Sequence, residues 1–129
     1  MIFSGLEALQ KRPGHIDFTL DELGEVDLKN EARVVGIRFV PGLDHMSIFL
    51  DFRYATAPKS ITLEFVDVEL TDVEYYLPRG VDPIGGYAVL MALDYWAHSE
   101  TGREGFSFYT TTLEVEFYAE EVRAHVRDI

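Results

Sequence analysis

The sequence predicts a mainly β protein, either an antiparallel β-sandwich or a strongly curved sheet of about six to eight strands, with a short N-terminal helix. Apolar and polar side chains alternate in several short segments that follow one another at hairpin spacing. No long amphipathic helix separates consecutive segments, which excludes a parallel βαβ design. Residues 1–129 are expected to form one β-rich domain, long enough to bury a hydrophobic core.

The N-terminal part is predicted to contain the helix and an acidic lead-in. Ser4 is a suitable N-cap for a helix over residues 4–12, and Pro13 and Gly14 would end it. Residues 17–31 carry six acids and one base. This stretch is assigned one short strand or an irregular conformation.

The first clear strands lie in the middle of the chain. Residues 33–40 and 46–54 each place apolar side chains on one parity, as half-buried strands do. Pro41 and Gly42 between them favour a turn, because proline presets φ and glycine tolerates positive φ. The two segments therefore predict a hairpin.

A further strand begins near Ile61, and its alternation is irregular. The parity slips by one residue near Val66, which predicts a β-bulge or a strand break. A second slip precedes Val73. Residues 77–86 are rich in proline and glycine and predict a loop.

The C-terminal third is also predicted to be mostly β. Residues 87–96 suit a strand covered on both faces, or a short buried helix. Residues 106–109 and 113–117 are rich in aromatic and β-branched side chains, which favour strands. Residues 122–127 fit a strand that pairs with residues 113–117, and they also fit helical spacing.

Composition excludes several classes of function. The absence of cysteine excludes disulfides, cysteine-ligated zinc and thiol catalysis. A net charge of −12 argues against binding nucleic acids or anionic membranes and favours a basic protein partner. The longest apolar run, residues 88–93, is too short to span a bilayer, and the N-terminus lacks an export signal. We expect a cytoplasmic protein.

No motif identifies a reaction. The four histidines, His15, His45, His98 and His125, have no metal-ligand spacing, and the glycines have no nucleotide-binding spacing. Glu114 and Glu116 alternate with apolar residues, as on a solvated strand face. We therefore predict no catalytic residue, no metal site and no cofactor, and a protein that is not an enzyme.

The acids instead suggest a binding surface. Residues 17–31 and 64–82 each hold six acids against one base, which is typical of a solvated face or of a surface that steers a basic partner. Trp96 shares the parity of Asp94 and His98, so it is expected to face outwards as a binding hot spot. The candidate partner-binding residues are Asp21, Glu22, Glu25, Asp27, Glu64, Asp67, Glu69, Asp72, Glu74 and Trp96.

The strand pattern also resembles a known group of proteins. Residues 34–39 (VVGIRF), the Pro-Gly turn, residues 47–52 (SIFLDF) and residues 61–70 (ITLEFVDVEL) resemble small β-rich bacterial immunity-type proteins of polymorphic toxin systems. The resemblance covers about residues 33–117. It implies a non-enzymatic protein that binds and neutralises a cognate toxin, and it assigns no functional residue.

Three functions are thus open from the sequence. The first is an acidic cytoplasmic protein-binding module, such as an immunity protein that neutralises a basic toxin. The second is a homo-oligomeric assembly protein, such as a homodimer formed through an exposed β-edge and the face of Trp96. The third is a small-ligand binder or hydrolase built in a concavity of the sheet.

Overall fold

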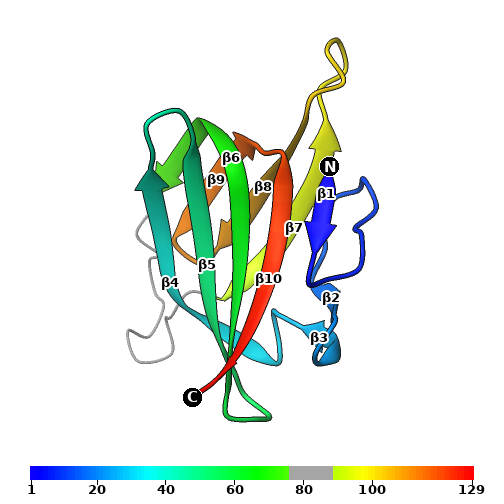
Figure 1. Cartoon of the computed structure of the whole chain (residues 1–129), viewed down its shortest axis with the longest axis vertical. Coiled ribbons are helices and arrows are strands. Elements are labelled where there is room, and N and C mark those ends of the chain that lie inside the picture. Colours follow the sequence, from blue (N-terminus) through cyan, green and yellow to red (C-terminus); the bar gives the residue numbers. More distant parts are fainter. Residues whose placement is uncertain (76–88) are drawn as a thin grey trace.

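The protein is an all-β fold built around one strongly curved sheet. The computed structural model describes residues 1–75 and 89–129, which form ten strands and contain no helix. An eight-stranded mixed sheet curls into a half-barrel, and a two-stranded hairpin sheet lies at its lower right in Figure 1. The predicted β class and strong curvature are confirmed. The predicted loop at residues 77–86 lies outside the described residues.

The strands follow one another closely along the chain. In order they are β1 (Ile2–Ser4), β2 (Asp17–Leu20), β3 (Gly24–Asp27), β4 (Ala32–Pro41), β5 (Met46–Tyr54), β6 (Lys59–Tyr75), β7 (Leu90–Ala97), β8 (Glu104–Thr110), β9 (Leu113–Tyr118) and β10 (Glu121–Asp128). The predicted hairpin of the middle region is β4–β5, and the segment that allowed a buried helix is strand β7.

β6 connects the two halves of the curved sheet. Its first half pairs with β5 and β10, and its second half pairs with β9. Between the halves, Asp67 has a φ of 55° and lies in a bulge where the register against β5 shifts. A second register shift lies between Leu70 and Asp72. Both predicted slips are therefore irregularities within one continuous strand, which bends because bulges increase local twist.

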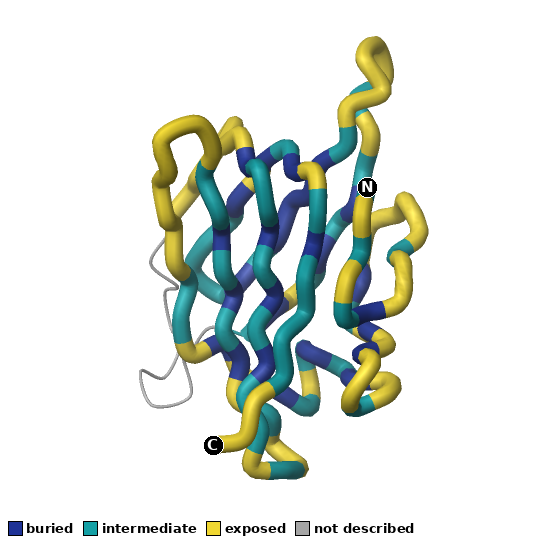
Figure 2. The backbone as a smooth tube through the Cα atoms, viewed as in Figure 1, coloured by how far each residue is buried: buried dark blue, intermediate teal, exposed yellow. Residues whose placement is uncertain are grey.

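The core lies on the concave side of the half-barrel (Figure 2). Phe65 of β6 is at its centre, with ring centroids 5.2 Å from Phe106 and 4.9 Å from Phe117. Burial of each such ring stabilises the fold by about 1.5–3 kcal/mol. The largest fully buried side chains are Phe18, Phe52, Phe65, Phe106, Phe108, Phe117, Leu20, Leu28, Ile48, Leu50, Ile61 and Leu63. The alternate residues of the central strands consequently face outwards.

The predicted N-terminal helix is wrong. Ser4 ends β1, which pairs in parallel with β10, so the sheet is mixed rather than wholly antiparallel. Phe3 packs edge-on against Tyr95, with ring centroids 5.8 Å apart. A helix this short is marginal in water, whereas the edge of β10 offers backbone partners and the core offers burial. Gly5 has a φ of 79° and turns the chain away from β10.

The acidic lead-in also differs from its prediction, because it forms two strands. β2 and β3 make an antiparallel hairpin. Phe18, Leu20 and Val26 are buried in the core cluster, while the alternate acidic residues face outwards. Burial of these three apolar side chains holds the hairpin against the core of the half-barrel.

β10 is a strand, but its predicted pairing with residues 113–117 is wrong. The strand pairs with β6 on one side and with β1 on the other. The amide of Glu120 donates to the carbonyl of Val66, 3.0 Å away, and so directs the chain onto the first half of β6. The bend of β6 at Asp67 separates the partners of its two halves.

Candidate functional site

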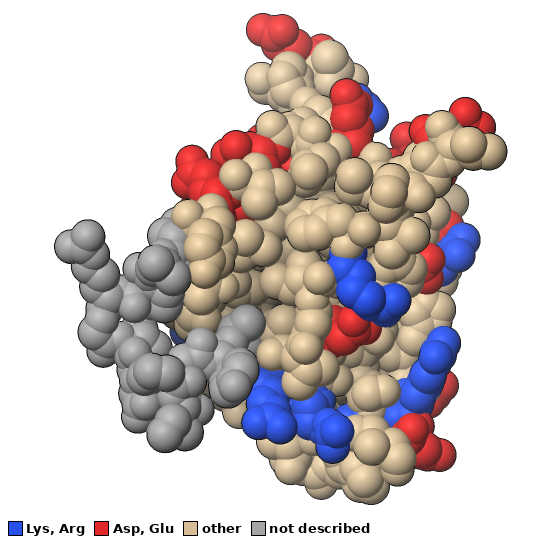
Figure 3. Space-filling model, turned by 90° about the vertical axis from the view of Figure 1, so that its left-hand side faces the viewer, with Lys and Arg blue, Asp and Glu red and all other residues tan. Residues whose placement is uncertain are grey.

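The outer surface of β6, β9, β8 and β7 collects acidic side chains from three strands. Val115 and Phe117 are buried, so the alternate residues of β9 face outwards. We call this set the acidic face; it consists of Glu69, Asp72 and Glu74 on β6, Asp94 on β7, and Glu114 and Glu116 on β9. Acidic side chains also gather at the upper left of the space-filling view (Figure 3).

Like charges lie directly opposite each other on the acidic face. Asp72 pairs across the strands with Glu116, and Glu74 pairs with Glu114. Such cross-strand pairs destabilise a sheet. Burial, followed by the charges of Glu74 and Asp72, raises the pKa of Glu114. The fold therefore holds negative charges close together at some cost in stability, and cations brought by a partner would relieve that cost.

An aromatic row borders the acidic face. Glu69, Tyr118, Gly105 and Trp96 are successive cross-strand neighbours on β6, β9, β8 and β7. The indole of Trp96 packs edge-on against Tyr118 at 5.3 Å, and its Nε1 donates to Ser107 Oγ at 3.0 Å. Trp96 faces outwards, as its parity predicts, but it is half-buried. Its ring occupies the space that a side chain at position 105 would fill if that residue were not glycine.

Arg103 joins the aromatic row to the acids. Its guanidinium lies 4.2 Å from the ring centre of Tyr118 and forms an ion pair with Glu69. This cation comes from the β7–β8 turn and pairs with Glu69 at one end of the acidic face, whereas Asp72 and Glu74 lie farther along β6. Arg103 thus marks the boundary between the acidic face and a neighbouring pocket.

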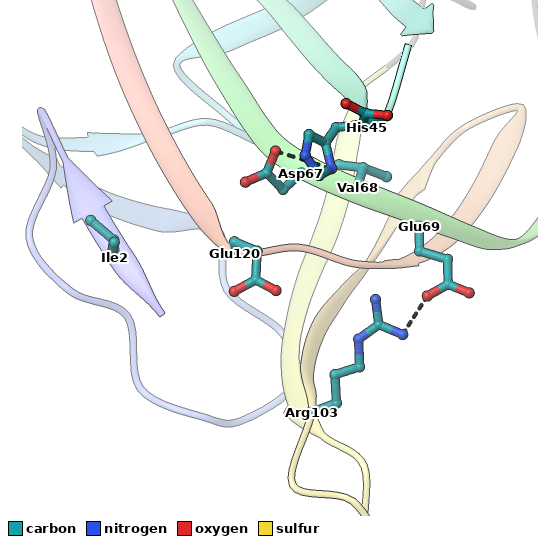
Figure 4. Close-up of a pocket in the computed structure, with 8 residues that line it drawn as sticks. Ile2, His45, Asp67, Val68, Glu69, Arg103 and Glu120 are labelled. Carbon is teal, nitrogen blue, oxygen red and sulfur yellow. Dashed lines mark hydrogen bonds and ion pairs between the residues drawn. The ribbon is translucent and has the colours of Figure 1, made fainter. Parts of the chain in front are cut away.

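That pocket lies where the ends of several strands meet (Figure 4). It has a volume of about 650 Å³ and is lined by Ile2, Asp44, His45, Asp67, Val68, Glu69, Arg103 and Glu120. His45 Nδ1 lies 3.6 Å from Asp67 Oδ1 across one side. Four carboxylates face one arginine and one histidine, so the pocket suits a cationic side chain. Its location next to Glu69 extends the acidic face around the edge of the sheet.

The structure does not bring all the predicted partner-binding residues together. Glu69, Asp72, Glu74 and Trp96 lie on or beside the acidic face, and Asp67 lies in the adjoining pocket. Asp21, Glu22, Glu25 and Asp27 lie in or beside the β2–β3 hairpin, which is a separate sheet, well apart from the second half of β6 (Figure 1). The two acidic stretches therefore do not form one surface.

Two of the predicted residues have local partners instead. Asp27 accepts hydrogen bonds from the backbone amides of Lys29 and Asn30, at 2.9 and 2.8 Å. The side chain of Asn30 also donates to Asp27, and this bond is the main reason that the pKa of Asp27 is lowered. Glu64 lies 2.8 Å from His125 Nε2 on the outer face of the β6–β10 pair. Neither acid belongs to the acidic face.

Sequence reasoning did not include Asp94, Glu114, Glu116 and Tyr118 among the binding residues. The alternation of Glu114 and Glu116 correctly indicates an outward strand face. Only the register of β9 against β6 shows that these acids lie opposite Asp72 and Glu74. That register depends on the bulges of β6. Hydrophobic alternation shows where these bulges lie, but it does not show which strand pairs with β6.

The described residues also limit what else the site can hold. They include no group of three or more His, Asp or Glu side chains arranged to bind a metal ion. His15 is buried, and its Nε2 lies 2.7 Å from the carbonyl of Gln10, which is a structural contact. Within the described part of the chain there is no helix of the length and apolarity that a membrane span requires.

No family model, curated protein or solved structure matches this chain.

Proposed function

We propose that this protein is an acidic protein-binding module whose acidic face docks a basic partner, and that the partner is a toxin that the protein neutralises as an immunity protein. One observation carries the proposal: the like-charge pairs Asp72–Glu116 and Glu74–Glu114 on one outer face. The strand-pattern resemblance to immunity-type proteins supports the choice of a toxin as partner.

The energetics favour binding of a cationic surface. Each like-charge pair opposes folding by an amount on the order of 0.2–1 kcal/mol, and lysine or arginine side chains of a partner would replace that repulsion by attraction. The net charge of −12 would also steer a basic partner during encounter. An acidic face is therefore suited to cover a positive cleft, such as the active site of a nuclease toxin.

The neighbouring aromatic row adds contact area. Trp96 and Tyr118 lie beside the acids, and tryptophan and tyrosine are enriched among the residues that dominate binding energy. Arg103 contacts both Tyr118 and Glu69. A cation of the partner could displace Arg103 from these two groups or share them with it. The proposed interface is thus acidic with an aromatic border.

The test uses Trp96, the only tryptophan of the chain, as a reporter. Titration with a short lysine- and arginine-rich peptide is expected to change its fluorescence, with an affinity that falls as salt is added. The double variant Glu74→Gln/Glu114→Gln is expected to bind about tenfold more weakly, because charge-assisted contacts are lost.

The matched control removes the same charge elsewhere. Asp21→Asn/Glu25→Gln alters exposed acids at the β2–β3 hairpin and is expected to bind the peptide almost as well as the natural protein. Equal loss in the two double variants would mean that net charge alone attracts the peptide. Salt-independent affinity would also contradict the proposal. The same two variants can then be assayed for neutralisation of a candidate basic toxin.

A further inference from the structure

Three cationic side chains line one pocket of this otherwise acidic protein. The pocket has a volume of about 550 Å³ and is lined by Lys29, Asn30, Ala32, Arg33, Arg53, Tyr54, Ala55 and Val89. None of these residues is acidic, although the chain has 23 acids and 11 bases. Figure 3 shows lysine and arginine side chains gathered in the lower half of the face that carries β4.

Most described lysine and arginine side chains outside this pocket form ion pairs, although Arg12 and Arg127 do not. Ion pairs with carboxylates involve Lys11, Arg38, Lys59, Arg103 and Arg123. Lys29, Arg33 and Arg53 form no ion pair with any residue in the ranges 1–75 and 89–129. Among the described residues, this pocket therefore gathers three cations and no carboxylate along its lining.

The strand register holds two of them together. Arg33 of β4 lies directly opposite Arg53 of β5. Their neighbours Val34 and Phe52 are buried, so both arginines face outwards and are exposed. Like charges in this arrangement repel each other, and an anion bound between them would replace repulsion by paired hydrogen bonds.

The third cation, Lys29, comes from a turn held by several hydrogen bonds. Asp27 caps this turn through the amides of Lys29 and Asn30, and the carboxylate of Glu31 accepts from the amide of Asp27 at 2.8 Å. The amide of Ala55 donates to the carbonyl of Glu31 at 2.8 Å and ties the turn to the end of β5. The acids nearest to Lys29 in sequence are therefore hydrogen-bonded within the turn.

We propose that this pocket binds the phosphate group of a small phosphorylated molecule. Three cations match the two negative charges of a phosphate better than the single charge of a carboxylate, and arginine pairs bind phosphate oxygens in a bidentate manner. The volume suits a small ligand. The pocket is separate from the acidic face, so this inference does not depend on the proposed function.

Calorimetric titration with inorganic pyrophosphate tests the proposal. We expect saturable binding by the natural protein, and about tenfold weaker binding by Arg33→Gln and by Arg53→Gln, since each removes one bidentate partner. The control Arg12→Gln removes an exposed cation whose NH1 donates only to the carbonyl of Pro13, and it is expected to change the affinity by less than about twofold. Thermal unfolding of Arg33→Gln should occur at an unchanged or higher temperature, because a like-charge pair is removed.

Several results would overturn the proposal. They are absence of saturable pyrophosphate binding, equal weakening by Arg12→Gln, and tighter binding of a single-stranded oligonucleotide than of pyrophosphate. Self-association that Arg53→Gln abolishes, without pyrophosphate binding, would instead assign the cations to the acidic face of a second copy. Parallel titrations with inorganic phosphate and a nucleoside diphosphate distinguish a free ion from a phosphate carried on a larger ligand. Tighter binding of the nucleoside diphosphate supports the carried group, whereas equal or tighter binding of inorganic phosphate contradicts it.

Discussion

Glu74 of β6 and Glu114 of β9 lie directly opposite each other on the outer face of the sheet. Their repulsion predicts that Glu74→Gln stabilises the protein at neutral pH, by about 0.2–1 kcal/mol. Urea unfolding at pH 7 measures this gain. The control Glu25→Gln, on the exposed side of β3, is expected to change the free energy of unfolding by less than about 0.5 kcal/mol. A loss of stability in Glu74→Gln would contradict the role assigned to the pair.

The same pair predicts a pH dependence. The pKa of Glu114 is raised in the folded protein by burial and by its acidic neighbours. The folded state therefore binds the proton more tightly than the unfolded state, and ionisation of Glu114 opposes folding. This penalty is present above the folded pKa and disappears as the pH falls through it to the unfolded value. Glu114→Gln should remove that part of the stability profile, which unfolding curves across mildly acidic pH measure.

A second carboxylate has the opposite pH behaviour. Burial opposes ionisation of Glu104, but hydrogen bonds from Tyr95, the N-terminal ammonium of Met1 and Lys11 lower the pKa of Glu104 to about 2. The ammonium lies 2.9 Å from Oε1, and the Lys11 amine 3.1 Å from Oε2. Because the folded pKa is depressed, the stabilisation is present above the unfolded pKa of 4.5 and is lost as the pH falls towards 2.

Glu104→Gln is expected to cost about 1.5–3 kcal/mol at pH 7, since hydrogen bonds to a charged group are lost. The loss should shrink as the pH falls from about 4.5 to 2, because the unfolded natural chain takes up a proton at Glu104 in this range while the folded chain resists it. Urea unfolding at several pH values measures both effects. Glu100→Gln, in the exposed β7–β8 turn, is the control. A pH-independent loss in Glu104→Gln would show that the shape of the side chain matters, and not its charge.

Gly105 provides the space for the ring of Trp96. A Cβ at this position would lie 2.4 Å from the carbonyl oxygen of Phe117 and 2.6 Å from Cη2 of Trp96. Gly105→Ala should therefore destabilise the protein by about 1–3 kcal/mol and shift the fluorescence of Trp96. In the control Gly36→Ala, the nearest atom is a side-chain oxygen of Asp51 at 3.3 Å, so a smaller loss is expected. Equal losses would contradict the packing argument.

Asp67 adopts a left-handed conformation in the bulge of β6. Asp67→Gly should be neutral or stabilising, because glycine enters this region without strain and the exposed contact with His45 contributes little. Asp67→Val should cost about 1–2 kcal/mol, because a β-branched side chain is poorly tolerated there. Thermal unfolding of both variants measures the difference. A glycine variant less stable than the valine variant would show that the carboxylate, and not the backbone, determines this bulge.

The sequence predicts the strands well where alternation is strong. β4, β5 and the first half of β6 each carry apolar residues at period two, and both irregularities of β6 are visible as slips near Val66 and Val73. The N-terminal helix is wrong because β1 gains backbone pairing with β10, which no local pattern reports. The partner of β10 is wrong for the same reason. Local propensity and parity contain no information on which distant edge a strand meets.

The candidate sites likewise depend partly on local sequence pattern and partly on long-range strand pairing. The sequence by itself determined that the chain is acidic, that its acids are clustered, and that Glu114 and Glu116 share an outward strand face, because charge and alternation are local properties. Only the tertiary structure decided that Asp72 and Glu74 meet those glutamates, that the β2–β3 acids lie elsewhere, and that Arg33 meets Arg53. The physical reason is that cross-strand register depends on bulges and on long-range pairing, which are selected by burial of the common core.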